Sequence, residues 1–352
     1  MNIGFDNKKY IKVQSEKIKE RFKLFDKLYL EIGGKLFDDY HASRVLPGFE
    51  PDVKIKILKE LKDDLEIVFC INANDIERNK KIKYILGNAA ECEPYLTIDY
   101  RTILESSEKI IDGLFIEMKI TEAEQGIIVL EDNKKDCLPI LQTAIEKLGY
   151  KDSMKVVLVK TKYPQGGEKS IVKAVLKKEI PAGKLPADVG CVISNIGTMC
   201  AISEAFREGK PLIDRALTLS GGACQTQKNV VVPIGTLISD LIPEVITLDE
   251  NVKKIISGGP MMGFSCANTS FPVVKNTSGV TFLTEKETFL EEESQCISCG
   301  SCVAKCAMRL SPALIVRELK AGNLDKAKSF GLMDCIECGC CAFVCPAKVN
   351  LI

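Results

Sequence analysis

Histidine and tryptophan are nearly absent: the 352 residues include one His and no Trp, and 48 Lys and Arg residues balance 48 Asp and Glu residues. A single His excludes HExxH metalloproteases and His-rich metal sites, and it argues against a Ser-His-Asp triad. Zero formal net charge provides no basic surface, so no nucleic-acid partner is expected. The uncharged run of residues 189–203 is too short and too polar to span a bilayer, and the longer run of residues 255–274 contains Gly, Pro, Ser and Asn and is also too polar.

Two further signals are missing. The first residues include Asp6, Lys8 and Lys9 and contain no apolar signal-peptide core. None of the Gly-Lys pairs is followed by Ser or Thr, which excludes a Walker A ATPase. These features predict a cytoplasmic protein without a transmembrane segment, and the length suggests two or three domains.

Cysteine, in contrast, is abundant: the chain has sixteen, and nine lie between Cys296 and Cys345. Without a secretory signal, such clustering indicates metal ligation and not disulfides. Two runs share the spacing C-x2-C-x2-C-x3-C, which is typical of bacterial ferredoxins with two [4Fe–4S] clusters. The runs are Cys296, Cys299, Cys302 and Cys306, and then Cys335, Cys338, Cys341 and Cys345, which Pro346 follows.

In this pattern the fourth Cys of each run binds the cluster of the other run. The predicted ligand sets are Cys296, Cys299, Cys302 and Cys345 for the first cluster, and Cys335, Cys338, Cys341 and Cys306 for the second cluster. A pair of zinc knuckles is the alternative, but zinc sites use two CxxC pairs or include His, so the doubled run fits them poorly. Cys340 is expected to be a spare buried thiol, and Ala307 replaces the Pro that would follow the first run.

Hydrophobic periodicity predicts a parallel α/β sheet in the middle of the chain, with its ligand at the carboxyl ends of the strands. After Pro211 the pattern changes to short β-like runs separated by Gly221-Gly222 and by Gly258-Gly259-Pro260, which indicates a small β-rich domain. The expected strands of the α/β part are 126–130, 155–160 and 191–194, and the expected helices are 102–115, 137–148, 169–176 and 198–206.

Glycines follow one of these strands. Gly166 and Gly167 stand directly before Glu168 and a predicted helix. A helix N-terminus after a Gly-rich turn can offer N–H groups to a phosphate or a carboxylate, but plain strand–turn–helix connections have the same pattern. From the local sequence alone, both interpretations stay open.

Two other turns carry polar residues. Asn195 and Thr198 lie between a predicted strand and a predicted helix, where Thr198 could be the N-cap or the turn could hold a cofactor phosphate. Asn88, Glu91 and Glu93 share a turn after another strand. Such polar turns are usually solvated, and two acids alone would serve proton transfer as well as redox chemistry.

Together, these segments resemble the RnfC family, the peripheral cytoplasmic subunit of the Rnf ion-translocating ferredoxin:NAD oxidoreductases. The resemblance extends from about residue 84 to residue 352, and the blocks occur in the family's order. The blocks are residues 88–97, 160–169, 185–190, 195–198 and 257–263 and both Cys runs. The same fold family includes the flavoprotein subunit of respiratory complex I, cobalamin reductases and a proline-reductase-associated electron carrier.

The resemblance implies an α/β fold with a Rossmann-like flavin- and nucleotide-binding domain, a small β-grasp-like domain and a C-terminal α-helical, two-cluster ferredoxin-like domain. It implies two [4Fe–4S] clusters and FMN as cofactors and NAD(H) as substrate. By position, Asn88 and Glu91 match the turn that holds flavin, and Glu93 lies near the nicotinamide. Gly166, Gly167 and Glu168 match the second Gly-rich turn, and Asn195 and Thr198 match the flavin-phosphate turn.

The first 83 residues depart from that family and resemble instead an uncharacterised bacterial α/β family. They contain neither its lipoyl-like domain nor the Gly-Gly-Ala-Gly-Phe-Pro-Thr loop that cradles flavin and nucleotide in RnfC proteins. The expected domains are an α/β fragment over 1–83, an FMN/NADH-binding-like domain over 84–211 without its N-terminal part, a β-grasp-like ligand-binding domain over 212–284 and a double-cluster domain over 285–352.

The sequence thus predicts an oxidoreductase subunit that passes electrons between NADH, FMN and two clusters. Its expected partners are the integral membrane Rnf subunits and ferredoxin, and its expected place is the cytoplasmic face of the membrane, as a peripheral protein. Two alternatives stay open. One is a ferredoxin-like electron carrier that lacks a working flavin site, and the other is a soluble reductase of a corrinoid or another partner enzyme.

Overall fold

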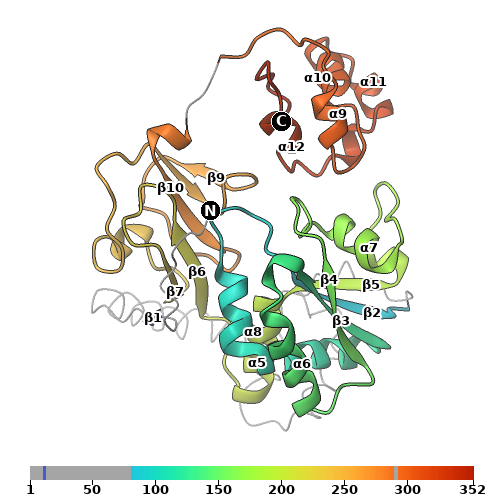
Figure 1. Ribbon diagram of the computed structural model, residues 1–352, viewed down its shortest axis with the longest axis vertical. Coiled ribbons are helices and arrows are strands. Elements are labelled where there is room, and N and C mark those ends of the chain that lie inside the picture. The colour runs from blue at the N-terminus through green and yellow to red at the C-terminus, as the bar shows by residue number, and fades with distance from the viewer. Residues whose placement is uncertain (1–10, 13–80, 289–291) are drawn as a thin grey trace, which may run out of the picture.

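The computed structural model describes residues 11–12, 81–288 and 292–352 (Figure 1). The α/β fragment expected over residues 1–83 therefore lies almost entirely outside the described residues. Its described part includes the short strand β1 (Ile11–Lys12), which pairs in parallel with a strand of the β-rich part. The rest of the described chain forms an α/β part, a β-rich part and a small helical part, in that order.

The α/β part is built on a four-stranded, wholly parallel sheet in the order β4-β3-β2-β5. The strands are β2 (Tyr84–Ala89), β3 (Gln125–Glu131), β4 (Met154–Val159) and β5 (Cys191–Asn195). The chain steps outward from β2 to β3 and β4, and then returns to place β5 on the other side of β2. The order reverses between β2 and β5, and open α/β sheets bind ligands beyond the carboxyl ends of strands at such a point.

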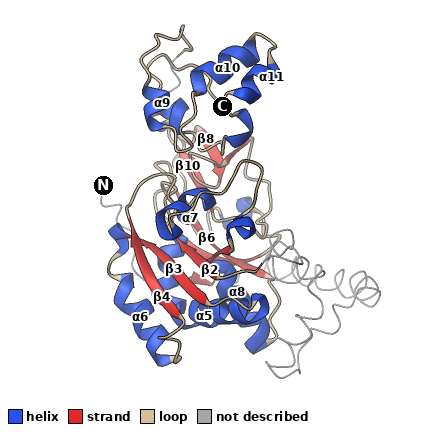
Figure 2. Ribbon diagram, turned by 90° about the vertical axis from the view of Figure 1, so that its right-hand side faces the viewer, coloured by secondary structure: helices blue, strands red, loops and turns tan. Residues whose placement is uncertain are grey.

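Helices cover both faces of this sheet (Figure 2). Because side chains alternate along a strand, Ile85 packs against the face of α5 (Ile98–Thr121), α6 (Cys137–Lys147) and α8 (Ile196–Glu208), whereas Leu86 packs toward α7 (Glu168–Leu176). The helices α5 and α8 cross closely at Gly113, where a Cβ would lie 2.0 Å from the Met199 carbonyl oxygen. The parallel α/β architecture expected from the periodicity is confirmed.

The β-rich part is a mixed sheet in the order β7-β6-β10-β8-β9, with β1 added beside β7. Its strands are β6 (Asp214–Ser220), β7 (Lys228–Pro233), β8 (Lys254–Ser257), β9 (Phe264–Cys266) and β10 (Gly279–Leu283). The central strands β6 and β10 run parallel, and each has an antiparallel neighbour on its outer side. This mixed sheet is the small β-rich part expected after residue 211, and Leu217, Val230 and Phe282 lie in its core.

The C-terminal part consists of short helices joined by the Cys-bearing loops. These helices are α9 (Ser301–Lys305), α10 (Pro312–Lys320), α11 (Leu324–Ser329) and α12 (Cys340–Phe343). The helices α9 and α12 each begin directly after a left-handed glycine, Gly300 and Gly339. In the part of the chain that the structure describes, no helix has both the length and the apolar character needed to cross a membrane.

Candidate functional site

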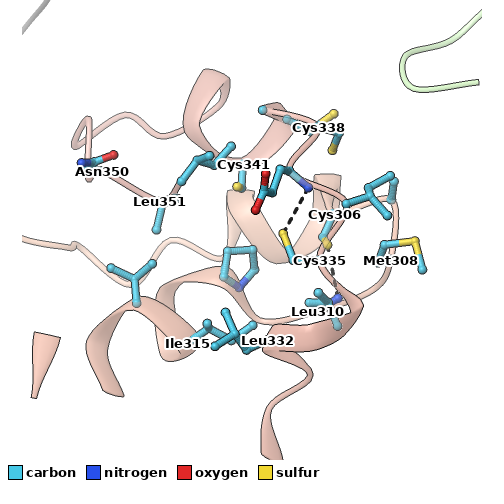
Figure 3. Close-up of a pocket in the computed structure, with 18 of the residues that line it drawn as sticks. Cys306, Met308, Leu310, Ile315, Leu332, Cys335, Cys338, Cys341, Asn350 and Leu351 are labelled. Carbon is cyan, nitrogen blue, oxygen red and sulfur yellow. Dashed lines mark hydrogen bonds between the residues drawn. The ribbon is translucent and has the colours of Figure 1, made fainter. Parts of the chain in front are cut away.

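The structure places the two predicted sets of thiols around two separate cavities, one set at each cavity. Cys306, Cys335, Cys338 and Cys341 line a cavity of about 340 Å³, together with apolar side chains that include Leu310, Ile315 and Leu332 (Figure 3). Cys296, Cys299, Cys302 and Cys345 line a second cavity of about 760 Å³. Each set joins three Cys of one run to the fourth Cys of the other. Ligation by these thiols remains a prediction.

The two Cys loops share one backbone conformation. Left-handed residues recur at matching positions of the runs: Ser298 and Glu337, Gly300 and Gly339, and Arg309 and Lys348. A residue with positive φ turns the chain sharply, and single residues of this kind do so in tight loops. The repeated spacing of the Cys residues is therefore a repeat of structure as well as of sequence.

Backbone N–H groups point at the cysteine sulfurs. Leu310 N–H donates to Cys306 Sγ at 3.3 Å, and Glu337 N–H donates to Cys335 Sγ at 3.4 Å (Figure 3). At the other cavity, Val349 N–H donates to Cys345 Sγ at 3.4 Å. Such donors stabilise the thiolate form that binds metal.

Across the described ranges, no three Cys, His, Asp or Glu side chains converge on a single point as the ligands of one metal ion do. The thiols are instead spread over the walls of the two cavities. This donor set of thiols, with N–H groups aimed at the sulfurs, fits polynuclear iron–sulfur clusters.

The three turns singled out in the sequence meet at the carboxyl ends of β2 and β5. Asn88 and Asn195 stand opposite each other at the end of the β2–β5 ladder. The side chain of Asn88 donates from Nδ2 to the Gly166 carbonyl oxygen at 3.0 Å and accepts from Ala90 N–H at 3.1 Å. The turns after β2 and before α7 are thus joined at the point where the strand order reverses.

Asn195 caps helix α8. Its Oδ1 accepts from Gly197 N–H at 2.8 Å, and its Nδ2 donates to Asp99 Oδ2 at 2.9 Å. The helix begins at Ile196, so Thr198 lies within its first turn. The interpretation of Thr198 as the N-cap is wrong, because the Asn195 side chain already satisfies an unpaired N–H group of the helix start.

Glu91 is buried and fully engaged by protein groups. With a side-chain exposure of 4%, it accepts from Asp99 N–H at 2.7 Å, from Tyr100 N–H at 3.2 Å and from Lys134 Nζ at 3.1 Å. It therefore supplies the N-terminal cap of α5. Burial, together with the neighbouring Glu91 carboxylate, raises the pKa of Asp99 to about 6. No sequence pattern indicates this role for Lys134 and Asp99, because their partners come from distant segments.

Glu93 binds the β-rich part. Its Oε1 accepts from Met261 N–H at 2.7 Å and from Met262 N–H at 3.2 Å. A Cβ at Gly259 would lie 2.1 Å from Glu93 Cγ, so only glycine permits this approach. Burial raises the pKa of Glu93, although these two hydrogen bonds act in the opposite direction. The loop of residues 258–263 is thereby fixed against the turn after β2.

The turn before α7 holds buried polar groups without partners. Among the described residues, Gln165 Nε2 and the Tyr163 hydroxyl are buried and have no hydrogen-bond partner, and Gln165 is only 2% exposed. Gly166 packs against β2, since a Cβ there would lie 2.4 Å from the Ala90 carbonyl oxygen. Gly167 then caps α7, whose first turn contains Glu168. Buried donors at this edge fit a polar ligand such as a flavin.

Residues 334–341, which carry three Cys of the second set and are called the second-cluster loop below, contact the turn before α7. The Cys340 thiol, half-buried rather than fully buried, donates to the Tyr163 carbonyl oxygen at 4.0 Å. Lys169 Nζ lies 3.9 Å from Asp334 Oδ1, and a Cβ at Gly339 would lie 3.1 Å from the Met261 carbonyl oxygen. The second-cluster cavity and the turns after β2 and β4 are therefore neighbours.

Family models match three regions of the chain. Residues 70–204 match the Nuo51 FMN-binding domain, and residues 288–346 match a 4Fe-4S dicluster domain. Residues 3–99 match the N-terminal part of a domain of unknown function, DUF1846. These matches confirm the expected fold class, the expected cofactor types, FMN and [4Fe–4S] clusters, and the resemblance of the first residues to a different, uncharacterised family.

Curated relatives are named as the C subunits of ion-translocating complexes. That of the proton-translocating ferredoxin:NAD(+) oxidoreductase of Clostridium ljungdahlii is 45% identical over 237 residues, which are 67% of this chain and 51% of that protein. That of the Na(+)-translocating complex of Acetobacterium woodii is 40% identical over 259 residues, 74% of this chain and 58% of that protein. The chain spans about half the length of the curated relatives it matches. The resemblance to the RnfC family is confirmed.

Solved structures show the same fold at low identity. The NAD+-reducing [NiFe]-hydrogenase in its air-oxidized state aligns with a TM-score of 0.56 at 14% identity, over 80% of this chain and 54% of that one. Its H2-reduced state aligns with a TM-score of 0.54 at 14% identity, over 85% and 56% of the two chains.

Proposed function

From the relationship of most of its length to the RnfC family of ion-translocating ferredoxin:NAD(+) oxidoreductases, we propose that this chain is an electron-transfer subunit of such a complex. It passes electrons between NADH, FMN and two [4Fe–4S] clusters. One observation carries the proposal: the second-cluster loop contacts the turn before α7, residues 163–167, through Cys340 and Tyr163. This turn and the turn after β2, which Asn88 joins to it, are together called the flavin turn.

FMN, when bound, would accept the hydride of NADH, which carries two electrons, and would release these electrons one at a time to the clusters. The residues that would form its site are Asn88 and Glu91 after β2, Gly166, Gly167 and Glu168 before and in α7, and Asn195 and Thr198 at the start of α8. Glu91 contributes by fixing the turn through its contacts with Asp99 and Lys134. Glu93, at the edge of the same turn, borders the nicotinamide. The positions of Asn88 and Asn195 at the reversal of strand order support this assignment.

The positions of the two Cys sets imply an order of electron transfer. The second cluster, held by Cys306, Cys335, Cys338 and Cys341, is next to the flavin turn. The first cluster is held by Cys296, Cys299, Cys302 and Cys345, of which two are exposed, whereas one of the four thiols of the second set, Cys335, is exposed. With both clusters bound, the second Cys set would therefore receive electrons from NADH first, and the first Cys set would pass them on.

The partners of the chain are the integral membrane subunits of the complex, and ferredoxin. The chain lies on the cytoplasmic face of the membrane as a peripheral subunit. The names of its relatives, each a component of a larger oxidoreductase complex, support assembly with other subunits. The domain limits that go with this function are 84–211 for flavin and nucleotide, 212–284 for the β-grasp-like domain and 285–352 for the clusters.

A ferredoxin-like carrier without a working flavin site is the second candidate. Its support is the match of residues 3–99 to a family other than the one that matches residues 70–204. The measurement that separates the two is the FMN content of the anaerobically purified chain with its clusters reconstituted. Close to one FMN per chain supports the first function. Intact clusters without FMN would exclude it and favour the carrier.

A further inference from the structure

The two Cys cavities share a wall. They are called here the first-cluster cavity, which Cys299 lines, and the second-cluster cavity, which Cys338 lines. Of the residues that the structure describes, two line both cavities, Val316 and Leu351. Both side chains are apolar, and Leu351, seen in Figure 3 beside the second-cluster cavity, is only 7% exposed. The same two side chains therefore border both thiol sets.

Helix α10 explains the position of Val316. One face of this helix lines the second-cluster cavity and consists of Pro312, Ile315 and Leu319. The neighbouring face lines the first-cluster cavity and consists of Ala313, Arg317 and Lys320. Residues three or four positions apart are neighbours on a helix surface. Val316 follows Pro312 by four positions and precedes Lys320 by four, so it lies at the boundary of the two faces.

The segment after Cys345 supplies the other part of the wall. Val349 lines the first-cluster cavity and Asn350 lines the second-cluster cavity, so the backbone runs between the two. Val349 N–H donates to Cys345 Sγ at 3.4 Å, which holds the segment against the first thiol set. Leu351 comes next and borders both cavities. A helix and an irregular segment thus each contribute one apolar side chain to the same wall.

We propose that Val316 and Leu351 form a partition between the two clusters that excludes water and across which electrons pass from one cluster to the other. Each transfer across this partition moves one electron, so that one cluster is oxidised as the other is reduced, and no bond or proton changes place. The passage of electrons rests on the proposed function, whereas the partition itself requires only that clusters fill both cavities.

A shared partition affects both clusters because each cluster lies against it. The polarity and solvent access around an iron–sulfur cluster set its reduction potential. A reduced cluster carries one more negative charge than an oxidised one, and polar or hydrated surroundings stabilise the larger charge. A polar group in the partition should therefore raise the reduction potentials of both clusters. The same group at a wall of one cavity should raise one potential.

The test is an EPR-monitored redox titration of Val316→Thr with both clusters reconstituted, using a chemical reductant. Threonine has the shape of valine but places a hydroxyl in the partition. Reduction of each cluster should become about threefold more favourable, a rise of about 28 mV for a one-electron couple. Cys338→Ala, which should lack the second cluster, identifies the signal of the first.

Two matched controls change one cavity each. Val303 lines the first-cluster cavity and not the second, so Val303→Thr should leave the potential of the second cluster unchanged. Leu351→Ala opens the partition to water and should raise both potentials. Leu332 lines the second-cluster cavity and not the first, so Leu332→Ala should leave the potential of the first cluster unchanged.

A shift of one cluster alone in Val316→Thr and in Leu351→Ala, or no shift in either, would overturn the proposal. Equal shifts of both clusters in the two controls would do the same. If a partition variant fails to hold its clusters, its iron content decides. Loss of both clusters supports a shared wall when Leu332→Ala keeps the first cluster, and counts against it when that control also loses both.

The titration needs neither NADH nor FMN. A chain that shows both shifts but takes no electrons from NADH would therefore refute the proposed function while leaving the partition intact.

Discussion

Single carboxylates at the flavin turn are held by protein groups and not by solvent. Glu91 caps α5 and pairs with Lys134, while Glu93 holds the 258–263 loop. Both are committed to structural contacts in this conformation. Their contribution to ligand binding is therefore to fix the shape of the turn. A direct contact of Glu93 with nicotinamide would require a carboxylate oxygen of Glu93 to accept a further hydrogen bond.

The raised pKa of Asp99, about 6, gives the chain a specific pH dependence. A carboxyl whose pKa is higher in the folded chain than in the unfolded one stabilises the fold below its unfolded pKa, and this stability is lost as the pH rises through 6. When the pH is lowered from 7.5 to 5.5, protonation of Asp99 should increase the free energy of unfolding of the wild type by about 1 kcal/mol. Asp99→Asn cannot take up this proton and should lack the increase. Thermal unfolding at the two pH values measures this difference, and equal shifts in both proteins would contradict it.

Elements meet at this site through glycines and backbone atoms. The expected strand and helix pattern predicted the sheet and its ligand-binding edge, and the Cys spacing predicted which thiols surround each cavity. The docking of Glu93 on Met261 could not be predicted, because it joins residues 168 positions apart and uses backbone N–H groups. The prediction that Thr198 is the N-cap of α8 was wrong for a local reason. Asn195 and Thr198 are both residue types that cap helices and lie three positions apart, so the sequence alone does not show which of them the fold uses.

The turn before α7 offers a test with adjacent glycines. In Gly166→Ala the new Cβ lies 2.4 Å from the Ala90 carbonyl oxygen, so the turn must move away from β2. We expect a loss of about 1–3 kcal/mol and of bound FMN. Gly167→Ala is the control for stability, because its Cβ meets nothing closer than 3.4 Å and its φ is −67°. The free energy of unfolding is compared between the two variants and flavin content is measured in Gly166→Ala; an equal loss of stability in both variants would speak against a tight contact at Gly166.

The two Cys loops offer a second matched pair. Gly300 and Gly339 have φ of 74° and 80°, so alanine strains either loop by about 1–2 kcal/mol. Only a Cβ at Gly339 meets another part of the chain, the Met261 carbonyl oxygen at 3.1 Å. Hydrogen exchange of the 258–263 loop should therefore become faster in Gly339→Ala and stay unchanged in Gly300→Ala. If both variants loosen this loop equally, the second-cluster loop does not rest on it.

Across the whole molecule, the contact of the second-cluster loop with the flavin turn predicts an order of electron transfer. Cys338→Ala should lose the second cluster, retain the first and prevent its reduction by NADH. Cys299→Ala should lose the first cluster and leave the second reducible by NADH. EPR of each variant after NADH addition measures this. Rapid NADH reduction of the first cluster in Cys338→Ala would show that the order is wrong, and retention of both clusters there would refute the ligand sets.

The most direct test of the proposed electron path is reduction of the wild-type clusters by NADH. The chain, purified anaerobically with FMN and both clusters present, is mixed with NADH, frozen after increasing times and examined by EPR. We predict reduced [4Fe–4S] signals that appear with oxidation of NADH and depend on bound FMN. Clusters that dithionite reduces but NADH leaves oxidised, with FMN bound, would contradict this path.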